Sequence, residues 1–242
     1  MIEPETRMNA PNPITSIAVT LLLALCSYRL YVVLKRRPCL YLEGSSPPTR
    51  SLAVFLGSGG HTSEALHLLS SLDFTRYTPR RYIVSEGDHL SAQKAIALEQ
   101  AKYSSHESPK SGHEYIIITI PRARRVHQSL FSTPLSTLWS LLACIYYLTI
   151  EPAFSLRTQT KMLTDVLILN GPGTCTTLCI AVIFNRFLGL PSPRVIYVES
   201  FARVHSLSAS GRLLRPLVDR FIVQWPQLLQ YGKRGDYVGW LI

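Results

Sequence analysis

The sequence predicts an α/β protein with a single Rossmann-like, doubly wound parallel sheet, preceded by one membrane-spanning helix. After residue 51, short apolar runs rich in β-branched residues alternate with stretches of helical spacing. This alternation indicates βαβ units and a parallel sheet. A glycine-rich loop follows the first run, as ligand-binding sheets of this class often require. A long apolar stretch near the N-terminus is followed by basic residues, which is typical of a membrane anchor.

The predicted anchor is the run at residues 13–34, which is followed at once by Lys35, Arg36 and Arg37. As a helix, these 22 residues span about 33 Å, enough to cross the apolar core of a bilayer. A cleaved signal peptide carries its basic residues before the apolar run, whereas here they follow it. The pattern favours a retained anchor with residues 1–12 in the lumen and all later residues in the cytosol. A signal peptide and a buried N-terminal helix are the alternatives.

The rest of the chain divides into a basic, proline-containing linker at residues 35–50 and a cytosolic domain at residues 51–242. Hydrophobic residues make up 47% of the sequence and charged residues 17%, which argues against disorder. The net charge of +10 suits an anionic partner such as a lipid headgroup or a diphosphate. The arginines are scattered and no long Lys/Arg-rich block or nucleic-acid motif occurs, so nucleic acid is not an expected partner.

Cysteine and histidine spacing argues against a metal site. None of the five cysteines forms a Cys-x-x-Cys pair, and the seven histidines are dispersed. We therefore expect no metal, no disulfide framework and no cofactor.

Six apolar runs predict strands, and five stretches of helical spacing predict most of the connections between them. The strands are expected at 52–56, 82–85, 115–120, 165–169, 194–198 and 220–224. The helices are expected at about 61–72, 89–103, 134–149, 174–187 and 207–218. Six strands suffice for one doubly wound domain, and no second set follows them.

Residues 135–150 are almost wholly apolar, and their role is ambiguous. A crossover helix buried against the sheet is one interpretation. Another is a helix whose aromatic face docks into the bilayer beside the preceding arginines. A second membrane crossing is the third, although it would split the parallel sheet between two compartments.

Residues 57–60, Gly-Ser-Gly-Gly, separate the first strand from a helix that Thr62 or Ser63 can cap. Such a turn exposes backbone N–H groups at a positive helix end and predicts a phosphate cradle. The loop lacks the lysine of a Walker A motif. A dinucleotide fingerprint is incomplete because Thr62 stands where its third glycine belongs, although Glu86 could supply the acid that it requires. A tight turn without a ligand remains an alternative.

Three motifs occur in one order after the predicted anchor. They are Gly57-Ser-Gly-Gly-His61-Thr62-x-Glu64, then Asn170-Gly-Pro-Gly-Thr174, then Tyr197-Val-Glu-Ser200 with Arg203 and Leu207-Ser-x-Ser-Gly211. Together they resemble the membrane-anchor subunit of the UDP-N-acetylglucosamine transferase of asparagine-linked glycosylation. The resemblance covers residues 15–242, nearly the whole chain.

The resemblance implies a function for the chain. The complex of that family adds the second N-acetylglucosamine (GlcNAc) to GlcNAc-diphosphodolichol on the cytosolic face of the endoplasmic reticulum. It is a two-domain glycosyltransferase of the GT-B type that is divided over two chains. The anchored chain resembles the N-terminal, acceptor-side half, while a soluble partner binds most of the UDP-GlcNAc donor. We therefore expect a single-pass protein of the endoplasmic reticulum and nuclear envelope that is inactive alone.

The same resemblance, together with the strand ends, suggests the site residues. The acceptor diphosphate is expected to lie against Gly57, Ser58, Gly59, Gly60, Asn170, Gly171, Gly173 and Thr174. His61 is a candidate general base, with a capping or packing role as the alternative. Glu64 is either a base or an acid favoured near a helix N-terminus. Glu199 either contacts the sugar, acts as base or pairs with Arg203.

The C-terminal tail is expected to bind the soluble partner through Tyr237, Val238, Trp240, Leu241 and Ile242. The resemblance favours this role, whereas the residues alone would equally allow the tail to pack into its own core.

Two other functions compete with the glycosyltransferase subunit. A membrane-tethered, NAD-dependent reductase would use Glu86 to bind the ribose, but no Tyr-x-x-x-Lys motif occurs after residue 51. A pure membrane tether, with a glycine loop that binds nothing, is the third possibility.

Overall fold

The computed structural model describes residues 12–35, 49–104, 114–124, 128–129, 131–154, 162–171, 173–231 and 234–241. The chain divides into two units, Met1–Arg36 and Arg37–Ile242. Most of the predicted lumenal segment and linker falls outside the described residues.

The first unit contains the helix α1, Pro13–Lys35. Its residues Ile14–Lys35 have a mean hydropathy of 2.1 and are long enough to cross a bilayer. The helix thus coincides with the predicted anchor and extends it by one residue.

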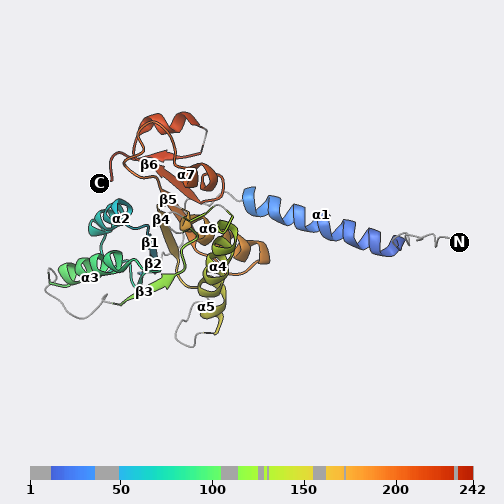
Figure 1. Cartoon of the computed structure of the whole chain (residues 1–242), viewed down its shortest axis with the longest axis horizontal. Coiled ribbons are helices and arrows are strands. Elements are labelled where there is room, and N and C mark those ends of the chain that lie inside the picture. Colours follow the sequence, from blue (N-terminus) through green and yellow to red (C-terminus); the bar gives the residue numbers. More distant parts are fainter. Residues whose placement is uncertain are drawn as a thin grey trace. The chain divides into compact units, whose positions relative to one another are not determined.

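The second unit contains one open sheet in which all seven strands are parallel (Figure 1). Its strand order is β3-β2-β1-β4-β5-β6-β7, so the order reverses between β1 and β4. The strands are β1 Leu52–Leu56, β2 Arg80–Ser85, β3 Tyr115–Ile120, β4 Val166–Asn170, β5 Arg194–Val198, β6 Arg220–Val223 and β7 Asp236–Tyr237. This confirms the doubly wound sheet, while the two-residue strand β7 was not predicted.

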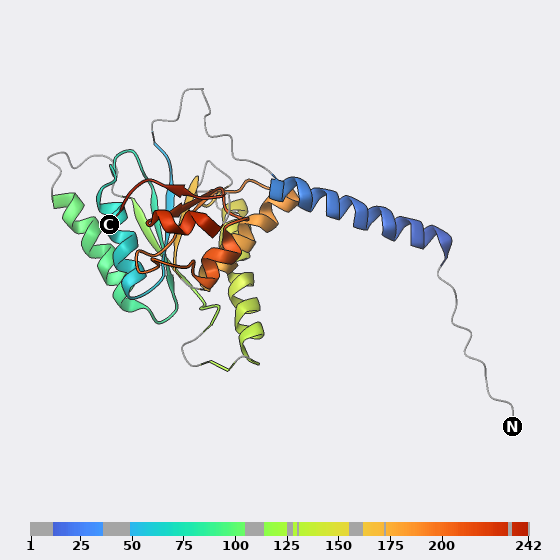
Figure 2. The ribbon, with the colours of Figure 1, turned by 90° about the horizontal axis from the view of Figure 1, so that it is seen from above.

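Helices cover both faces of the sheet. Figure 2 shows α2 and α3 (cyan and green) on one side and α4 and α6 (yellow-green and orange) on the other. The helical segments are α2 Gly60–Ser70, α3 His89–Ser104, α4 Thr133–Ile145, the π-helix η1 Tyr146–Ile150, α5 Glu151–Phe154, α6 Thr174–Leu188, α7 Ala209–Leu214 and the 3-10 helix η2 Pro226–Tyr231. The five predicted helices are therefore present.

Strand alternation divides the hydrophobic core into two halves. Ala53 and Phe55 of the central strand β1 belong to the half under α4 and α6. Leu52, Val54 and Leu56 belong to the half under α2 and α3. All five residues of β1 are buried, as expected for a strand that is covered on both faces.

The strand β2 begins two residues before the predicted boundary. The prediction relied on apolar residues, whereas the first residue of the strand is a buried arginine. Arg80 forms a bidentate ion pair with Glu99 of α3, at 2.6 and 2.8 Å, and the Tyr82 hydroxyl donates to the same carboxylate. Composition alone does not predict such residues in a core strand, since charged groups are rarely buried unless paired.

The ambiguous apolar segment is a crossover helix with only one buried face. Helical structure runs from Thr133 to Phe154, and Cys144 and Leu148 pack into the core. A second membrane crossing is wrong, because β1 before the segment pairs directly with β4 after it.

The last predicted helix, 207–218, is shorter than expected. α7 spans only Ala209–Leu214, with Ser208 as its N-cap. Pro216 lacks a backbone N–H and disfavours helical geometry at the residue before it, so the helix ends earlier than its apolar pattern.

Candidate functional site

Two glycine turns meet where the strand order reverses. Gly57 follows β1, and Gly171 follows β4, which lies beside β1 in the sheet. In open α/β sheets, ligands bind outside the carboxyl ends of the strands at this switch point. The structure therefore brings two of the three sequence motifs together at the position where this fold binds its ligands.

Gly57 and Gly171 allow the two turns to approach each other. A Cβ atom on Gly57 would lie 2.7 Å from the Asn170 carbonyl oxygen. Gly171 has a φ of +127°, and a Cβ there would lie 3.0 Å from the Cα of Gly57. Packing alone therefore requires glycine at both positions.

The other glycines of the turns border open space. A Cβ on Gly59, Gly60 or Gly173 would meet no heavy atom within 4 Å. Ser58 and Gly59 both have positive φ values, of 60° and 58°. These residues leave backbone accessible to a ligand at the start of α2.

The predicted cap of α2 is wrong. The N-cap residue is Gly59, and no described side chain caps the helix. Thr62 is buried in the first turn, where its hydroxyl lies 2.6 Å from that of Ser91 on α3. A helix start without a side-chain cap leaves N–H groups that can bind an anion.

His61, Asn170 and Glu64 form a hydrogen-bonded chain across the switch point. His61 Nδ1 lies 2.8 Å from Asn170 Oδ1, and Asn170 Nδ2 donates to Glu64 Oε2 at 3.0 Å. Asn170 is buried, whereas the His61 side chain is 34% exposed. The chain thus connects a buried amide to an imidazole that a ligand can reach.

When Glu64 is ionised, this chain favours one tautomer of His61. An ionised carboxylate only accepts hydrogen bonds, so Glu64 must face the amide nitrogen of Asn170. The Asn170 oxygen then faces His61 and accepts a hydrogen bond from Nδ1–H. A neutral His61 therefore has the free electron pair of Nε2 available to accept a proton.

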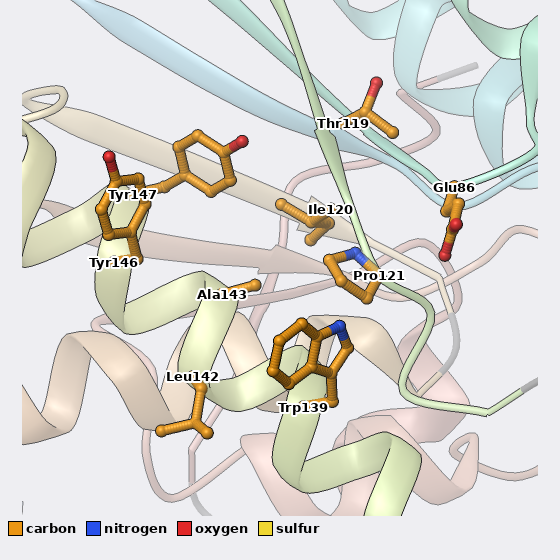
Figure 3. A pocket seen from close by; sticks show the side chains of 9 residues that line it. All are labelled: Glu86, Thr119, Ile120, Pro121, Trp139, Leu142, Ala143, Tyr146 and Tyr147. Atoms are coloured by element: carbon orange, nitrogen blue, oxygen red, sulfur yellow. The ribbon is translucent and has the colours of Figure 1, made fainter.

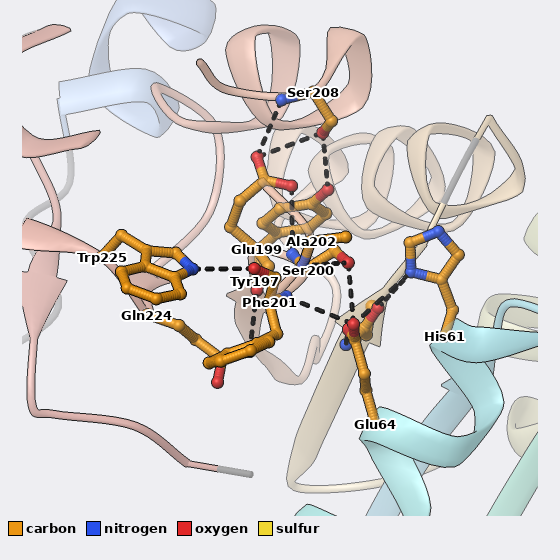
Figure 4. A network of polar contacts seen from close by, with 11 residues as sticks. His61, Glu64, Tyr197, Glu199, Ser200, Phe201, Ala202, Ser208, Gln224 and Trp225 are labelled. Atoms are coloured by element: carbon orange, nitrogen blue, oxygen red, sulfur yellow. Dashed lines mark hydrogen bonds and ion pairs between the residues drawn. The ribbon is translucent and has the colours of Figure 1, made fainter. Parts of the chain in front are cut away.

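The second oxygen of Glu64 binds the loop after β5. Glu64 Oε1 accepts hydrogen bonds from the Ser200 hydroxyl at 2.8 Å and from the Phe201 N–H at 3.2 Å (Figure 4). Glu64 therefore joins α2, β4 and the β5 loop. This geometry suits a residue that positions His61.

Glu199 lies beneath this loop and is only 1% exposed. Its carboxylate accepts hydrogen bonds from the Ser200 and Ser208 N–H groups and from the Ser208 hydroxyl. Burial raises the pKa of the Glu199 carboxyl, although these hydrogen bonds and the charge of Arg203 oppose the shift. Within the described chain Glu199 forms no ion pair with Arg203, and its carboxylate is enclosed by protein groups.

Thr174 also has a partner within the protein. Its hydroxyl accepts a hydrogen bond from the Ala123 N–H at 3.2 Å and so holds the segment before α4. Of the predicted diphosphate-binding residues, the accessible ones are Ser58, Gly59, Gly60 and Gly173. The remaining four residues are buried and form part of the packing of the turns. They are Gly57, Asn170, Gly171 and Thr174.

The C-terminal tail both packs into the protein and faces solvent. The Leu241 side chain packs against the core under α2 and α3, and its N–H donates to Gln224 Oε1. Tyr237, Val238 and Trp240 are exposed. Ile242 lies outside the described residues.

An aromatic cluster joins this tail to the site. The ring centroid of Trp240 lies 5.5 Å from that of Trp225 and 6.0 Å from that of Phe201. Trp225 Nε1–H donates to the Phe201 carbonyl at 2.7 Å. Sequence reasoning missed this cluster because its members are distant in the chain.

Sequence reasoning also missed Ser208. This residue could have been identified as a helix cap by its position before an apolar stretch.

The fold and the site together define a doubly wound α/β domain with two glycine turns at its switch point, one of which opens a helix that has no side-chain cap. Among the described residues, no group of three His, Cys, Asp or Glu side chains could hold a metal ion.

A family model described as "Oligosaccharide biosynthesis protein Alg14 like" matches residues 52–241. The chain is 49% identical to a UDP-N-acetylglucosamine transferase subunit ALG14 of Cryptococcus neoformans over 73% of this chain and 74% of the relative. The Schizosaccharomyces pombe relative of the same name is 42% identical, with 87% and 92% covered. The Rattus norvegicus relative is 37% identical, with 88% and 91% covered. The chain belongs to the Alg14 family.

This membership does not support the reductase alternative. The matched relatives are named as transferase subunits, and the family model covers the whole glycine-loop domain. The family and the apolar helix α1 together identify a membrane protein.

Proposed function

We propose that the chain is the membrane-anchoring, acceptor-binding subunit of a UDP-GlcNAc transferase. The names of its relatives support the transferase class, and α1 supports the anchoring role. The acceptor is GlcNAc-diphosphodolichol, to which the complex adds a second GlcNAc. The protein resides in the endoplasmic reticulum membrane, with its N-terminus in the lumen and the sheet domain in the cytosol.

The acceptor diphosphate binds at the start of α2. The uncapped helix start and the open space beside Gly59, Gly60 and Gly173 support this placement. Backbone N–H groups at a positive helix end bind phosphate without a lysine side chain. The net charge of +10 further favours an anionic ligand.

His61 acts as the general base for the attacking sugar hydroxyl. The observation that carries this role is the chain from Glu64 through Asn170 to His61, which leaves Nε2 as the proton acceptor. General-base catalysis contributes about 10²–10⁴-fold to a rate. Glu64 and Glu199 are positioning residues in this scheme, since both carboxylates are bound by protein donors.

The donor sugar nucleotide binds mainly to a second chain. The seven strands described here form one sheet, whereas a GT-B active site lies between two such domains. The exposed residues Tyr237, Val238 and Trp240 supply the docking surface for that soluble subunit, together with Leu241 and Ile242. The chain alone is therefore expected to be inactive.

A reconstituted transfer assay tests this function. The chain is expressed in microsomes with and without a soluble donor-binding subunit, and GlcNAc transfer from UDP-GlcNAc to a synthetic GlcNAc-diphospho-lipid is measured. Activity is expected only when both chains are present. A Gly60→Trp variant should abolish transfer, because its side chain would fill the open space at the start of α2.

The matched control is His67→Trp, which places the same bulk on an exposed position of α2 outside the turn. It should retain activity. Full transfer by the chain alone would contradict the two-chain proposal. Normal transfer by Gly60→Trp would show that the loop is only a turn and that the chain is a tether.

A further inference from the structure

The outer face of α4 and η1 is apolar. We call this surface the α4 face. Leu135 is 74% exposed and Trp139 is 65% exposed. The other exposed side chains recur at helical spacing: Phe131, Leu138, Leu142, Tyr146 and Ile150. A helix on the surface of a soluble domain normally shows the opposite pattern, with its apolar stripe turned inward.

The polar groups of this helix point inward instead. Ser140 lies 3.1 Å from the Thr177 hydroxyl of α6, and Thr149 donates to Asn185 of α6 at 2.5 Å. These contacts hold the helix against the domain, so it cannot leave to cross a bilayer. Its exposed apolar side chains remain turned away from the sheet.

The opposite side of the sheet has a different surface. Many exposed side chains of α2 and α3 are polar: Ser63, His67, His89, Gln93 and Gln100. By contrast, residues 128–150 include no Asp, Glu, Lys or Arg. The α4 face is therefore an exposed apolar patch on a helix without charged residues, as expected for a surface that contacts an apolar environment.

A hollow deepens the α4 face beside the end of β3. Its volume is about 550 Å³, and its apolar lining includes Ile120, Pro121, Trp139 and Leu142 (Figure 3). Among the described residues of this lining, Glu86 is the one that is charged. The hollow can take up part of a hydrocarbon chain. On a flat surface, the same hydrocarbon would remain in contact with water.

Three further features point to a bilayer as the occupant. Arg122 and Arg124 precede the helix and can meet lipid phosphates, while Trp139 and Tyr146 are of the types enriched at membrane interfaces. The helix α1 is long and apolar enough to anchor the same chain. The 13 residues at 36–48 between the helix and the domain can span at most about 45 Å, which limits how far the domain can lie from a membrane that holds the helix.

We propose that the α4 face is a second membrane-contact surface, which lies in the boundary between headgroups and acyl chains of the bilayer that α1 spans. This inference does not depend on the transferase reaction or on the identity of the acceptor. Interfacial helices of this kind bury their apolar face about 5–10 Å below the headgroups.

Fluorescence quenching on the full chain tests the proposal. Cys26 and Cys39 are replaced by serine, which leaves three buried cysteines, Cys144, Cys175 and Cys179. A nitrobenzoxadiazole probe is attached at Leu138→Cys, and the protein is reconstituted in phosphatidylcholine–phosphatidylserine vesicles. Lipids with a nitroxide on the acyl chain should quench roughly half of the probe's emission, which should also shift to the blue.

The matched control carries the probe at Gln93→Cys, on the polar outer face of α3. Its emission should remain that of a probe in water. Adding Leu135→Glu and Leu142→Glu to the Leu138→Cys protein should abolish quenching, because both side chains point away from the core. Water-like emission at residue 138 on vesicles would overturn the proposal. A blue shift there without quenching would also overturn it, since protein rather than lipid would then cover the face.

Discussion

At the residue scale, the most constrained contact joins Glu199 to Gly211. A Cβ on Gly211 would lie 2.1 Å from Glu199 Oε2, a separation that no packing can accommodate. Glu199 cannot move aside without losing its hydrogen bonds to Ser208. The spacing of Ser208 and Gly211 in the third motif therefore has a packing reason that is independent of any ligand.

A Gly211→Ala substitution should destabilise the folded chain by about 1–3 kcal/mol, as overpacked sites do. Thermal unfolding of the full chain in detergent, followed by tryptophan fluorescence, measures this loss as a lower Tm, by about 2–4 °C for each kcal/mol. Gly60→Ala is the control, because its Cβ would enter open space. Equal Tm values for the two variants would contradict the argument.

The raised pKa of Glu199 predicts how stability depends on pH. Because burial favours the protonated form, the folded chain binds this proton more tightly than the unfolded chain. The contribution to the free energy of unfolding is present below the ordinary value of 4.5 and is lost as pH rises through the raised pKa. The stability of the wild type relative to Glu199→Gln should therefore fall as pH rises above 4.5, in urea unfolding at several pH values. Parallel profiles for the two proteins would refute this expectation.

At the scale of elements, one buried ion pair connects α3 to β2. Arg80 and Glu99 are 2% and 4% exposed, and Arg80 also donates to the Phe74 and Tyr77 carbonyls. The pair satisfies a charge at the start of a core strand that would otherwise be costly to bury. It therefore fixes the position of α3 on β2.

Glu99→Ala should cost about 3–5 kcal/mol, because it leaves a buried guanidinium without its counter-charge. The exposed pair of Arg220 and Asp236, at 45% and 44% exposure, provides the comparison. Asp236→Ala should cost about 0–1 kcal/mol. Urea unfolding of both variants measures the difference. Similar losses would show that burial does not determine how much each ion pair contributes to the free energy of unfolding.

At the scale of the whole molecule, the C-terminal tail and the candidate site are physically connected. Trp240 packs on Phe201 and Trp225, and the Phe201 N–H donates to Glu64. A subunit that docks on Trp240 would therefore contact a side chain that packs on Phe201, in the loop that binds Glu64. Binding of the proposed partner could therefore affect the orientation of His61, the proposed base, through Phe201 and Glu64.

Trp240→Ala should weaken association with the soluble donor-binding subunit by roughly thirtyfold, since a buried tryptophan at an interface contributes about 2 kcal/mol or more. Binding is measured by titration of the partner onto vesicles that carry the full chain. Ile116→Ala removes a similarly exposed apolar side chain from the edge strand β3 and should leave binding unchanged. Equal affinities for both variants would place the interface elsewhere.

The sequence by itself determined the fold class, the anchor and the positions of the two glycine turns. These properties are local: strand and helix periodicity, one long apolar run and glycine-rich turns can be recognised in a few adjacent residues. The same locality explains the errors. The start of β2 was predicted two residues too late because Arg80 is charged, and α7 was predicted too long because Pro216 ends the helix early.

Only the tertiary structure decided which site residues meet and which remain accessible. His61 and Asn170 are 109 residues apart in the chain, and Glu64 and Ser200 are 136 apart, yet each pair is hydrogen-bonded. The parallel pairing of β1 with β4, and of β4 with β5, creates these contacts. Burial likewise separated Glu199 from the accessible site, and the packing of α4 on α6 left the α4 face exposed, because accessibility depends on neighbours that no local pattern contains.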